Sequence, residues 1–183
     1  SSIQAIVDYL ENDWTDGENS LELPVQVTKP EGSAEDLAYV KDLLGSFTTS
    51  FSTSSADRSK NVNSGAKHVN GTVLYPGETF SMYETVAPFT AENGYAMAGS
   101  YLNGEVVDSM GGGICQVSTT LYYAVLRAEL EVVERSPHSM TVHYVELSED
   151  AAIAGTYKDF KFKNSTEYPI YIEGYTTSDK KIT

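Results

Sequence analysis

Apolar residues recur at helical spacing in four stretches of the chain. Near the start, Ile3, Ile6, Val7 and Leu10 share one face of a predicted helix over residues 2–13. Further helices are predicted to begin at Ser33, to span residues 56–69 and to follow Cys115. Their apolar stripes are, in that order, Leu37, Val40, Leu43 and Leu44; Val62, Ala66 and Val69; and Val117, Leu121, Ala124, Val125 and Ala128.

The last third of the chain alternates between apolar and polar positions, which is typical of strands. The predicted strands cover residues 131–135, 139–147, 151–155, 159–164 and 168–175. Earlier, residues 72–82 are expected to form strand, turn and strand, and residues 94–105 a short strand with a turn at Asn103–Gly104. We therefore expect an α+β fold, with helices in the first two thirds and the Cys-bearing helix packed on a mainly antiparallel C-terminal sheet.

Residues 1–30 are predicted to be a segment separate from the main domain. Residues 21–30 alternate like a strand after the first helix, and Pro24 would confine that strand to a sheet edge. We expect this segment to be the tail of an upstream domain or a linker, and residues 31–183 to be the main domain. The chain begins without an initiator Met, so we expect a fragment or a processed form.

Composition and charge narrow the class of protein. The chain has 183 residues, of which 40% are hydrophobic, enough for one domain with a core. Its 26 acidic and 12 basic residues give a formal net charge of −14. This charge opposes binding to nucleic acids and to anionic membrane surfaces. No apolar run approaches the roughly 20 residues that span a bilayer.

A triple glycine runs directly into the helix that carries Cys115, the one cysteine of the chain. The N–H groups and dipole of a helix's first turn stabilise a thiolate. Glycines let a substrate approach the main chain, and the N–H groups of residues 113–116 suit an oxyanion. These parts favour acyl transfer through a thioester, although a small buried cysteine is the plain structural alternative. A lone cysteine and scattered histidines predict neither a metal site nor a cofactor.

A cysteine nucleophile needs an imidazole base, and the chain has three histidines: His68, His138 and His143. His138 lies in a predicted loop, where it can face a pocket, whereas His143 falls inside a predicted strand. A third group must fix the tautomer of the base. Asp150 is the candidate for this role, and its rivals are Glu149 and Asp159.

Five ordered motifs within residues 45–175 resemble the VanW domain family. They are ADRSKNVNSGAKHVNGTVL, PGETFS, GGGICQVSTTLYYA, ERSPHSMTVHYV and EDAAIAGTYKDFKFKN. Residues 1–30 are similar to the end of a domain, thought to bind peptidoglycan, that often precedes VanW domains. The resemblance implies an extracytoplasmic protein of the Gram-positive cell envelope, often held by an N-terminal membrane anchor that this chain lacks.

The resemblance also implies roles for individual residues. The family's cysteine nucleophile falls on Cys115, its loop histidine on His138, and an aspartate on Asp150, with Ser148 in place of the family's glycine two residues earlier. The expected substrate-binding residues are Arg58, Asn61 and Arg135, together with Gly112, Gly113, Gln116 and Ser118 around the cysteine.

The implied activity is a peptidoglycan L,D-transpeptidase that forms 3-3 cross-links through a Cys115 thioester. We expect a monomer that binds peptidoglycan stem peptides, without nucleic acid, metal or cofactor. Two alternatives stay open. One is a thiol carboxypeptidase or endopeptidase on stem peptides, which would share the site. The other is a non-catalytic peptidoglycan-binding module in which Cys115 is buried.

Overall fold

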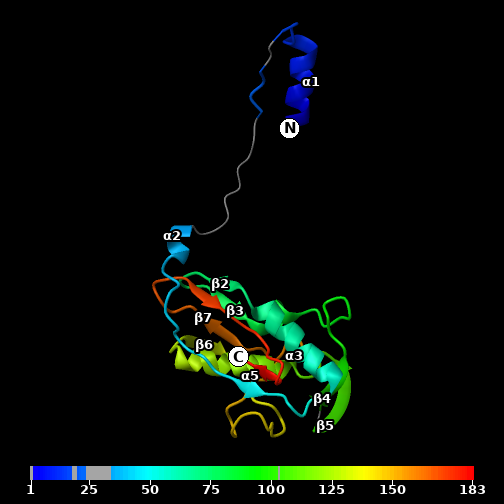
Figure 1. Cartoon of the computed structure of the whole chain (residues 1–183), viewed down its shortest axis with the longest axis vertical. Coiled ribbons are helices and arrows are strands. Elements are labelled where there is room, and N and C mark those ends of the chain that lie inside the picture. The colour runs from blue at the N-terminus through cyan, green and yellow to red at the C-terminus, as the bar shows by residue number, and fades with distance from the viewer. Residues whose placement is uncertain (1, 18–19, 24–33, 103) are drawn as a thin grey trace. The chain divides into compact units, whose positions relative to one another are not determined.

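A computed structural model describes residues 2–17, 20–23, 34–102 and 104–183 (Figure 1). The chain divides into two compact units, Ser1–Ser33 and Ala34–Thr183. The first unit contains α1 (Ser2–Asn12), which confirms the first predicted helix. Most of the strand predicted over residues 21–30 lies outside the described residues. Among the described helices, none has the length and apolarity to cross a bilayer.

The helices of the second unit are α2 (Ala34–Leu37), α3 (Ala56–Val69), α4 (Met82–Val86) and α5 (Ile114–Arg127). The predictions for α3 and α5 are confirmed. The prediction of a helix reaching Leu44 is wrong, because α2 ends at Leu37 and Leu43 is 83% exposed. Ser33, its predicted start, lies outside the described residues. The helices α3 and α5 pack closely at Gly65, where an added Cβ would lie 2.7 Å from the Ile114 side chain.

Every strand pair is antiparallel, which confirms the α+β class. The strands are β1 (Thr49–Ser50), β2 (Thr72–Leu74), β3 (Thr79–Ser81), β4 (Met97–Leu102), β5 (Glu105–Met110), β6 (Glu131–Glu134), β7 (Lys161–Lys163), β8 (Ile170–Ile172) and β9 (Lys181–Ile182). They pair as β1–β9, β2–β8, β3–β7–β6 and β4–β5. Three strands that precede α5, namely β1, β2 and β3, therefore pair with strands that follow it, and these pairs tie the two halves of the domain together.

Two of the predicted C-terminal strands are wrong. Residues 139–147 and 151–155 form no strand, apart from an isolated bridge between Ala154 and Lys158. Residues 151–153 instead lie against α5, where the Ala151 N–H donates to Thr119 Oγ1 at 3.0 Å. Their apolar side chains are buried by a helix rather than by a sheet. The strand β5 was not predicted, because its sequence EVVDSM is largely exposed and alternates weakly.

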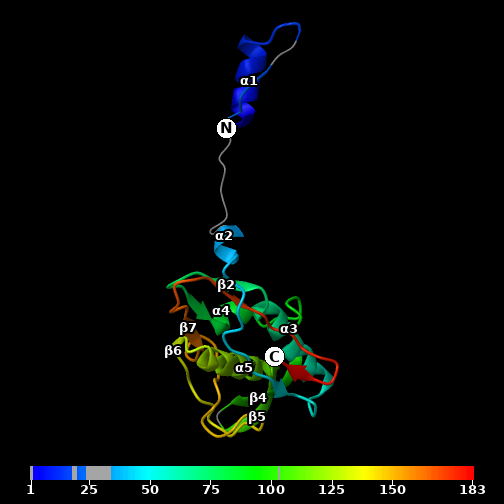
Figure 2. The ribbon, with the colours of Figure 1, turned by 60° about the vertical axis from the view of Figure 1, so that its left-hand side comes forward.

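Aromatic side chains anchor α5 to the three-stranded sheet. Phe80 and Phe162 are paired across β3 and β7, with ring centroids 5.1 Å apart. Phe160 stacks on Phe162 at 5.6 Å and meets the edge of Tyr122 of α5 at 5.4 Å. In Figure 2, β5 leads into the N-terminal end of α5 and β6 leaves its C-terminal end. The first turn of α5 is thus held between the β4–β5 hairpin and the core.

Candidate functional site

The glycine turn between β5 and α5 has a geometry that side chains would obstruct. Gly113 caps α5 in the left-handed region, with φ +108°. A Cβ on Gly112 would lie 2.2 Å from the Ala98 carbonyl oxygen, so the turn crosses the backbone of β4 closely. The Asn61 amide, which is fully buried, donates to the carbonyls of Ala96 and Gly112 and accepts from the Ala96 N–H. Asn61 therefore fixes the turn and presents no surface to a substrate.

Cys115 is the second residue of α5 and is partly buried. Its thiol donates to the Ile153 carbonyl at 3.5 Å. The N–H groups of Ile114 and Gln116 donate to carbonyls of the turn, at 3.2 and 3.0 Å. Within the described residues, no backbone hydrogen bond to another residue occupies the N–H groups of Gly113 and Cys115. These two groups are the ones left to bind an oxyanion.

Burial raises the pKa of the Cys115 thiol. The Ile153 hydrogen bond and the Arg58 charge lower this pKa, while the Asp150 charge raises it further. The net direction is upward, because a thiolate loses more solvation than these neighbours return. The resting sulfur is accordingly a protonated thiol at neutral pH, and it needs a base to become a nucleophile.

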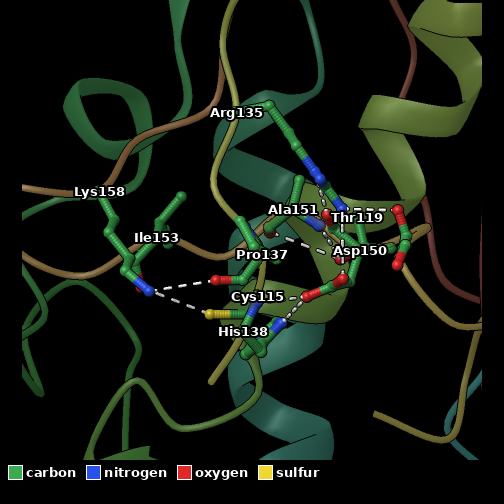
Figure 3. Close-up of polar contacts among 10 residues, drawn as sticks. Cys115, Thr119, Arg135, Pro137, His138, Asp150, Ala151, Ile153 and Lys158 are labelled. Carbon is green, nitrogen blue, oxygen red and sulfur yellow. Dashed lines mark hydrogen bonds and ion pairs between the residues drawn. The ribbon is translucent and has the colours of Figure 1, made fainter. Parts of the chain in front are cut away.

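His138 and Asp150 form a pair beside this helix turn (Figure 3). Asp150 Oδ2 accepts from the His138 backbone N–H at 2.6 Å and lies 2.5 Å from His138 Nδ1. Each of the two side chains is 8% exposed. Burial by itself would raise the pKa of Asp150, but the two hydrogen bonds from His138 outweigh it and hold that pKa below its ordinary value. An ionised Asp150 accepts a hydrogen bond from the Nδ1–H of His138, which leaves Nε2 with its lone pair.

The segment that carries Asp150 also carries the thiol's partner, Ile153. Ala151, between them, binds Thr119 of α5, and Thr119 follows Cys115 by one helical turn. The thiol and the His138–Asp150 pair are therefore held against the same stretch of chain, as Figure 3 shows. Cys115, His138 and Asp150, which are 12 to 35 positions apart in sequence, are thus brought to one end of α5, where the thiol bonds to Ile153 and the imidazole to Asp150.

Arg135 holds Asp150 from the other side. Its guanidinium donates to the carbonyls of Asp150 and Ser148, at 2.6 and 2.7 Å, and to Asp150 Oδ1 at 3.3 Å. It also lies over the Tyr122 ring. Ser148 has φ +66°, so it keeps the left-handed conformation that suits the glycine of the family motif. Arg135 is thus engaged in the fold of the site.

Arg58, on α3, packs against the glycine turn. Its Nη1 donates to Ser54 Oγ at 2.6 Å and to Gln116 Oε1 at 2.9 Å. The side chain packs on Gly113, where a Cβ would lie 2.9 Å from Arg58 Cγ. Burial lowers the pKa of Arg58, and nearby Tyr144, Tyr101 and Cys115 oppose this through their negative charge when ionised.

Two further members of the expected substrate-binding set are buried. Gln116 is 1% exposed, and its Nε2 donates to Thr49 Oγ1 and to the Ser50 carbonyl. Ser118 is fully buried, and its hydroxyl has no hydrogen-bond partner among the described residues. Both side chains face the interior, and Gln116 contributes to the site by positioning Arg58.

The rival bases and acids have other positions. His143 is exposed, and His68 Nδ1 contacts the Ser64 carbonyl at 2.7 Å within α3. Asp159 binds the Ser81 hydroxyl and the Tyr83 N–H at the start of α4. None of these contacts reaches Cys115 in the part of the chain that the structure describes. The described residues also contain no cluster of three His, Cys, Asp or Glu side chains suited to a metal ion.

Two tyrosines at the site were not anticipated from the sequence. The Tyr101 ring, on β4, meets the His138 ring edge-on, with centroids 6.1 Å apart. Tyr144 lies within electrostatic reach of Cys115 and Arg58, and burial raises its pKa. The signal for Tyr144 was its place just after His138 in a segment rich in hydroxyl groups. That signal was masked by the strand expected there.

Known proteins match most of the chain. A family model described as "VanW like protein" covers residues 57–183. The uncharacterized protein YoaR of Bacillus subtilis (strain 168) is 38% identical over 157 residues, 85% of this chain and 52% of the relative. The vancomycin B-type resistance protein VanW of Enterococcus faecalis (strain ATCC 700802 / V583) is 32% identical over 129 residues, 67% of this chain and 46% of the relative.

The chain thus spans about half the length of the curated relatives that it matches. No solved structure matches it. The family match extends from α3 through the glycine turn and Cys115 to the His138–Asp150 pair and the C-terminal strands. On this evidence, the chain belongs to the VanW-like family.

Proposed function

We propose that this domain is a cysteine-dependent acyltransferase of the cell wall, a peptidoglycan L,D-transpeptidase that works outside the cytoplasmic membrane on stem peptides. The observation that carries the proposal is the arrangement of the thiol and the imidazole. Cys115 begins a helix, and its sulfur and the His138–Asp150 pair contact one short segment, residues 150–153. A relative named for vancomycin resistance supports a role at the cell wall.

In the first half-reaction, His138 Nε2 takes the thiol proton as Cys115 Sγ attacks the carbonyl that joins the third residue of a donor stem to its terminal D-Ala. The N–H groups of Gly113 and Cys115 bind the oxyanion. The C–N bond then breaks, and the imidazolium gives its proton to the leaving amine. D-Ala departs, and the third residue of the donor remains bound to sulfur as a thioester.

In the second half-reaction, the side-chain amine on the third residue of another stem attacks the thioester. His138 Nε2 accepts a proton from that amine, the C–S bond breaks, and the sulfur is reprotonated. The product is a 3-3 cross-link and the enzyme returns to its starting state. Asp150 acts throughout by holding Nδ1–H, which keeps the tautomer that both steps require.

The raised pKa of Cys115 supports activation by a general base. A preformed thiolate–imidazolium pair would require a lowered thiol pKa. Here the proton moves as the carbonyl carbon is attacked, and His138 is a general base rather than a counter-ion. The general-base role of His138 depends on the hydrogen bond between its Nδ1 and Asp150.

The test uses the purified protein, a disaccharide tetrapeptide and mass spectrometry of the products. We expect a dimer joined 3-3, release of D-Ala, and a thioester adduct on the intact protein. Cys115→Ala should abolish all three, and His138→Gln should slow adduct formation by about 10²–10⁴-fold. The exposed His143 provides the matched control, since His143→Gln should leave the rate unchanged.

Different results would overturn the proposal. Cross-linking by Cys115→Ala would remove the nucleophile from the mechanism. A free tripeptide as the sole product would instead indicate a carboxypeptidase, in which water resolves the same thioester. Absence of any adduct, with stem peptides still bound, would indicate a non-catalytic binding module.

A further inference from the structure

We propose that Arg58 binds the free terminal carboxylate of the donor peptide and so restricts the site to the last peptide bond of a stem. This inference rests on the proposed function, because it assigns a residue to the recognition of that donor. Recognition of this carboxylate distinguishes two kinds of enzyme: one that removes a terminal residue, and an endopeptidase. The inference also means that this strongly acidic protein binds a negatively charged group of its substrate.

The hydrogen bonds of Arg58 leave one edge of its guanidinium open. Both of its side-chain bonds come from Nη1, to Ser54 and Gln116. In the described part of the chain, Nε and Nη2 have no hydrogen-bond partner. These two N–H donors point in parallel from one edge of the planar group, which is the fork that binds a carboxylate through two oxygens.

The charge of Arg58 is not neutralised within the protein. The ion pairs between described residues involve Arg135, His138, Lys161 and Lys181, and Arg58 takes part in none of them. Its partners are a hydroxyl and an amide oxygen, which orient a guanidinium without cancelling its charge. Partial burial of an unpaired cation is unfavourable, so a site that maintains one is suited to a ligand that supplies the anion.

The start of α5 adds to this field. The N-terminus of a helix is positive, and Arg58 packs directly on its capping residue, Gly113. Two positive groups side by side repel each other, and an anion between or beside them is attracted by both. The absence of a Cβ at Gly113 is what permits the close approach, since a Cβ there would lie 2.9 Å from Arg58 Cγ.

The position of the fork relative to the thiol is fixed by Gln116. This fully buried side chain holds Arg58 through Oε1, and its Nε2 is tied to Thr49 and Ser50 of β1. Gln116 is also the residue after Cys115. The Arg58 charge lowers the pKa of the Cys115 thiol, so the guanidinium lies within electrostatic reach of the sulfur. A carboxylate bound there belongs to the leaving residue, directly beyond the scissile bond.

A chemical probe tests the anion site without any peptide. Iodoacetate and iodoacetamide both alkylate a thiol with loss of iodide, but only iodoacetate carries a carboxylate. We expect Cys115 to favour iodoacetate, relative to the ratio for a free thiol in the same buffer. The ratio of the two rates is independent of the thiol pKa, because both reagents react with the same thiolate.

Variants of Arg58 should change this ratio. Loss of a charge-assisted hydrogen bond is worth about tenfold to hundredfold in binding, so Arg58→Gln should lower the iodoacetate preference by that factor. Arg58→Lys keeps the charge but not the fork, and should retain part of the preference. Arg127, at the far end of α5, bonds to the Ser46 carbonyl, and Arg127→Gln is the control that should leave the ratio unchanged.

The peptide experiment compares a disaccharide tetrapeptide with the same compound amidated at its C-terminus, using the wild-type protein. We expect acylation by the amide to fall about as far as Arg58→Gln lowers acylation by the acid. Equal acylation by acid and amide, or an iodoacetate ratio unmoved in Arg58→Gln, would overturn the carboxylate site. Cross-linking that tolerates the amide would leave the transpeptidase intact and refute Arg58 alone. A strong iodoacetate preference without any cross-linking would support the Arg58 carboxylate site and refute the transpeptidase.

Discussion

Replacing Asp150 by Asn tests whether the carboxylate, rather than its shape, holds the site together. Asp150 accepts three hydrogen bonds, two from His138 and one from Arg135, and its side chain is 8% exposed. An amide of the same size presents an N–H₂ group to at least one of these donors. Removing one partner from a buried charged pair typically costs about 3–5 kcal/mol. We expect Asp150→Asn to lose a free energy of unfolding in that range at pH 7.

The direction of the Asp150 pKa shift predicts how the free energy of unfolding changes with pH. The pKa of Asp150 is lowered in the folded protein, so the folded state binds its proton less readily than the unfolded state does. The stabilisation is therefore complete above the ordinary carboxyl pKa of about 3.9 and is lost as the pH falls through the lowered folded value. The difference in stability between the wild type and Asp150→Asn should shrink over that interval.

The assay is urea unfolding followed by far-ultraviolet circular dichroism at several pH values. Tryptophan emission is unsuitable, because the single tryptophan, Trp14, belongs to the first unit. Asp179 provides the control, since its ion pair with Lys181 is exposed and Asp179→Asn should change little. The reasoning fails if Asp150→Asn matches the wild type at pH 7. It also fails if the difference between them grows as the pH falls.

Three further changes follow from the same contacts. Burial raises the pKa of Cys115, so the rate of alkylation by iodoacetamide should rise with pH to a midpoint above that of a free thiol, and Arg58→Gln should move the midpoint higher still. Gly113→Ala, at φ +108° and facing Arg58, should cost about 1–2 kcal/mol in urea unfolding and lower the iodoacetate preference. Asn61→Ala leaves the Ala96 N–H and the Gly112 carbonyl without their partner, although the Ala96 carbonyl keeps the Gly111 N–H, and should cost about 2–4 kcal/mol, measured in the same way.

The helices around the site could be predicted because their signals are local. The stripe of Val62, Ala66 and Val69 sets the buried face of α3, and the Ser55 hydroxyl caps its first turn. A run of three glycines followed by an apolar stripe likewise marks the start of α5. In both cases, the residues that determine the element lie within a few positions of one another.

The strand pairing could not be predicted, because it depends on contacts that are distant in sequence. Residues 72–82 look like two strands around a Pro76–Gly77 turn, yet β2 pairs with β8 and β3 with β7. The alternation of residues 151–155 suggested a strand, but the side chains of Ala151 and Ile153 are buried beside α5. Alternation reports which side chains are buried and does not say by which element.

The candidate site residues were named from local motifs. Cys115, His138 and Asp150 lie within motifs, and the motifs carried the prediction. The contact between Arg58 and Gly113 joins residues 55 positions apart, and no local pattern marks it. The sequence also suggested that Asn61 and Arg135 contact substrate. Their side chains are instead used by the glycine turn and by Asp150, respectively.

In the proposed mechanism, the charges around Cys115 influence whether an amine or water resolves the thioester. The negative charge of Asp150 is paired with His138 and Arg135, whereas Arg58 has no anionic partner among the described residues. In the proposed mechanism, His138 gives a proton to the amine of the leaving D-Ala, and Arg58 binds its carboxylate. An acceptor amine has an ordinary pKa of about 10.4 and arrives as a cation. A protonated amine has no lone pair and cannot attack, so it must first lose its proton to solvent, whereas water is neutral and needs no such step. The ratio of cross-linked dimer to hydrolysed tripeptide should therefore rise with pH between 6 and 9, as mass spectrometry of timed digests can measure. A ratio that stays constant would show that the amine is deprotonated within the site.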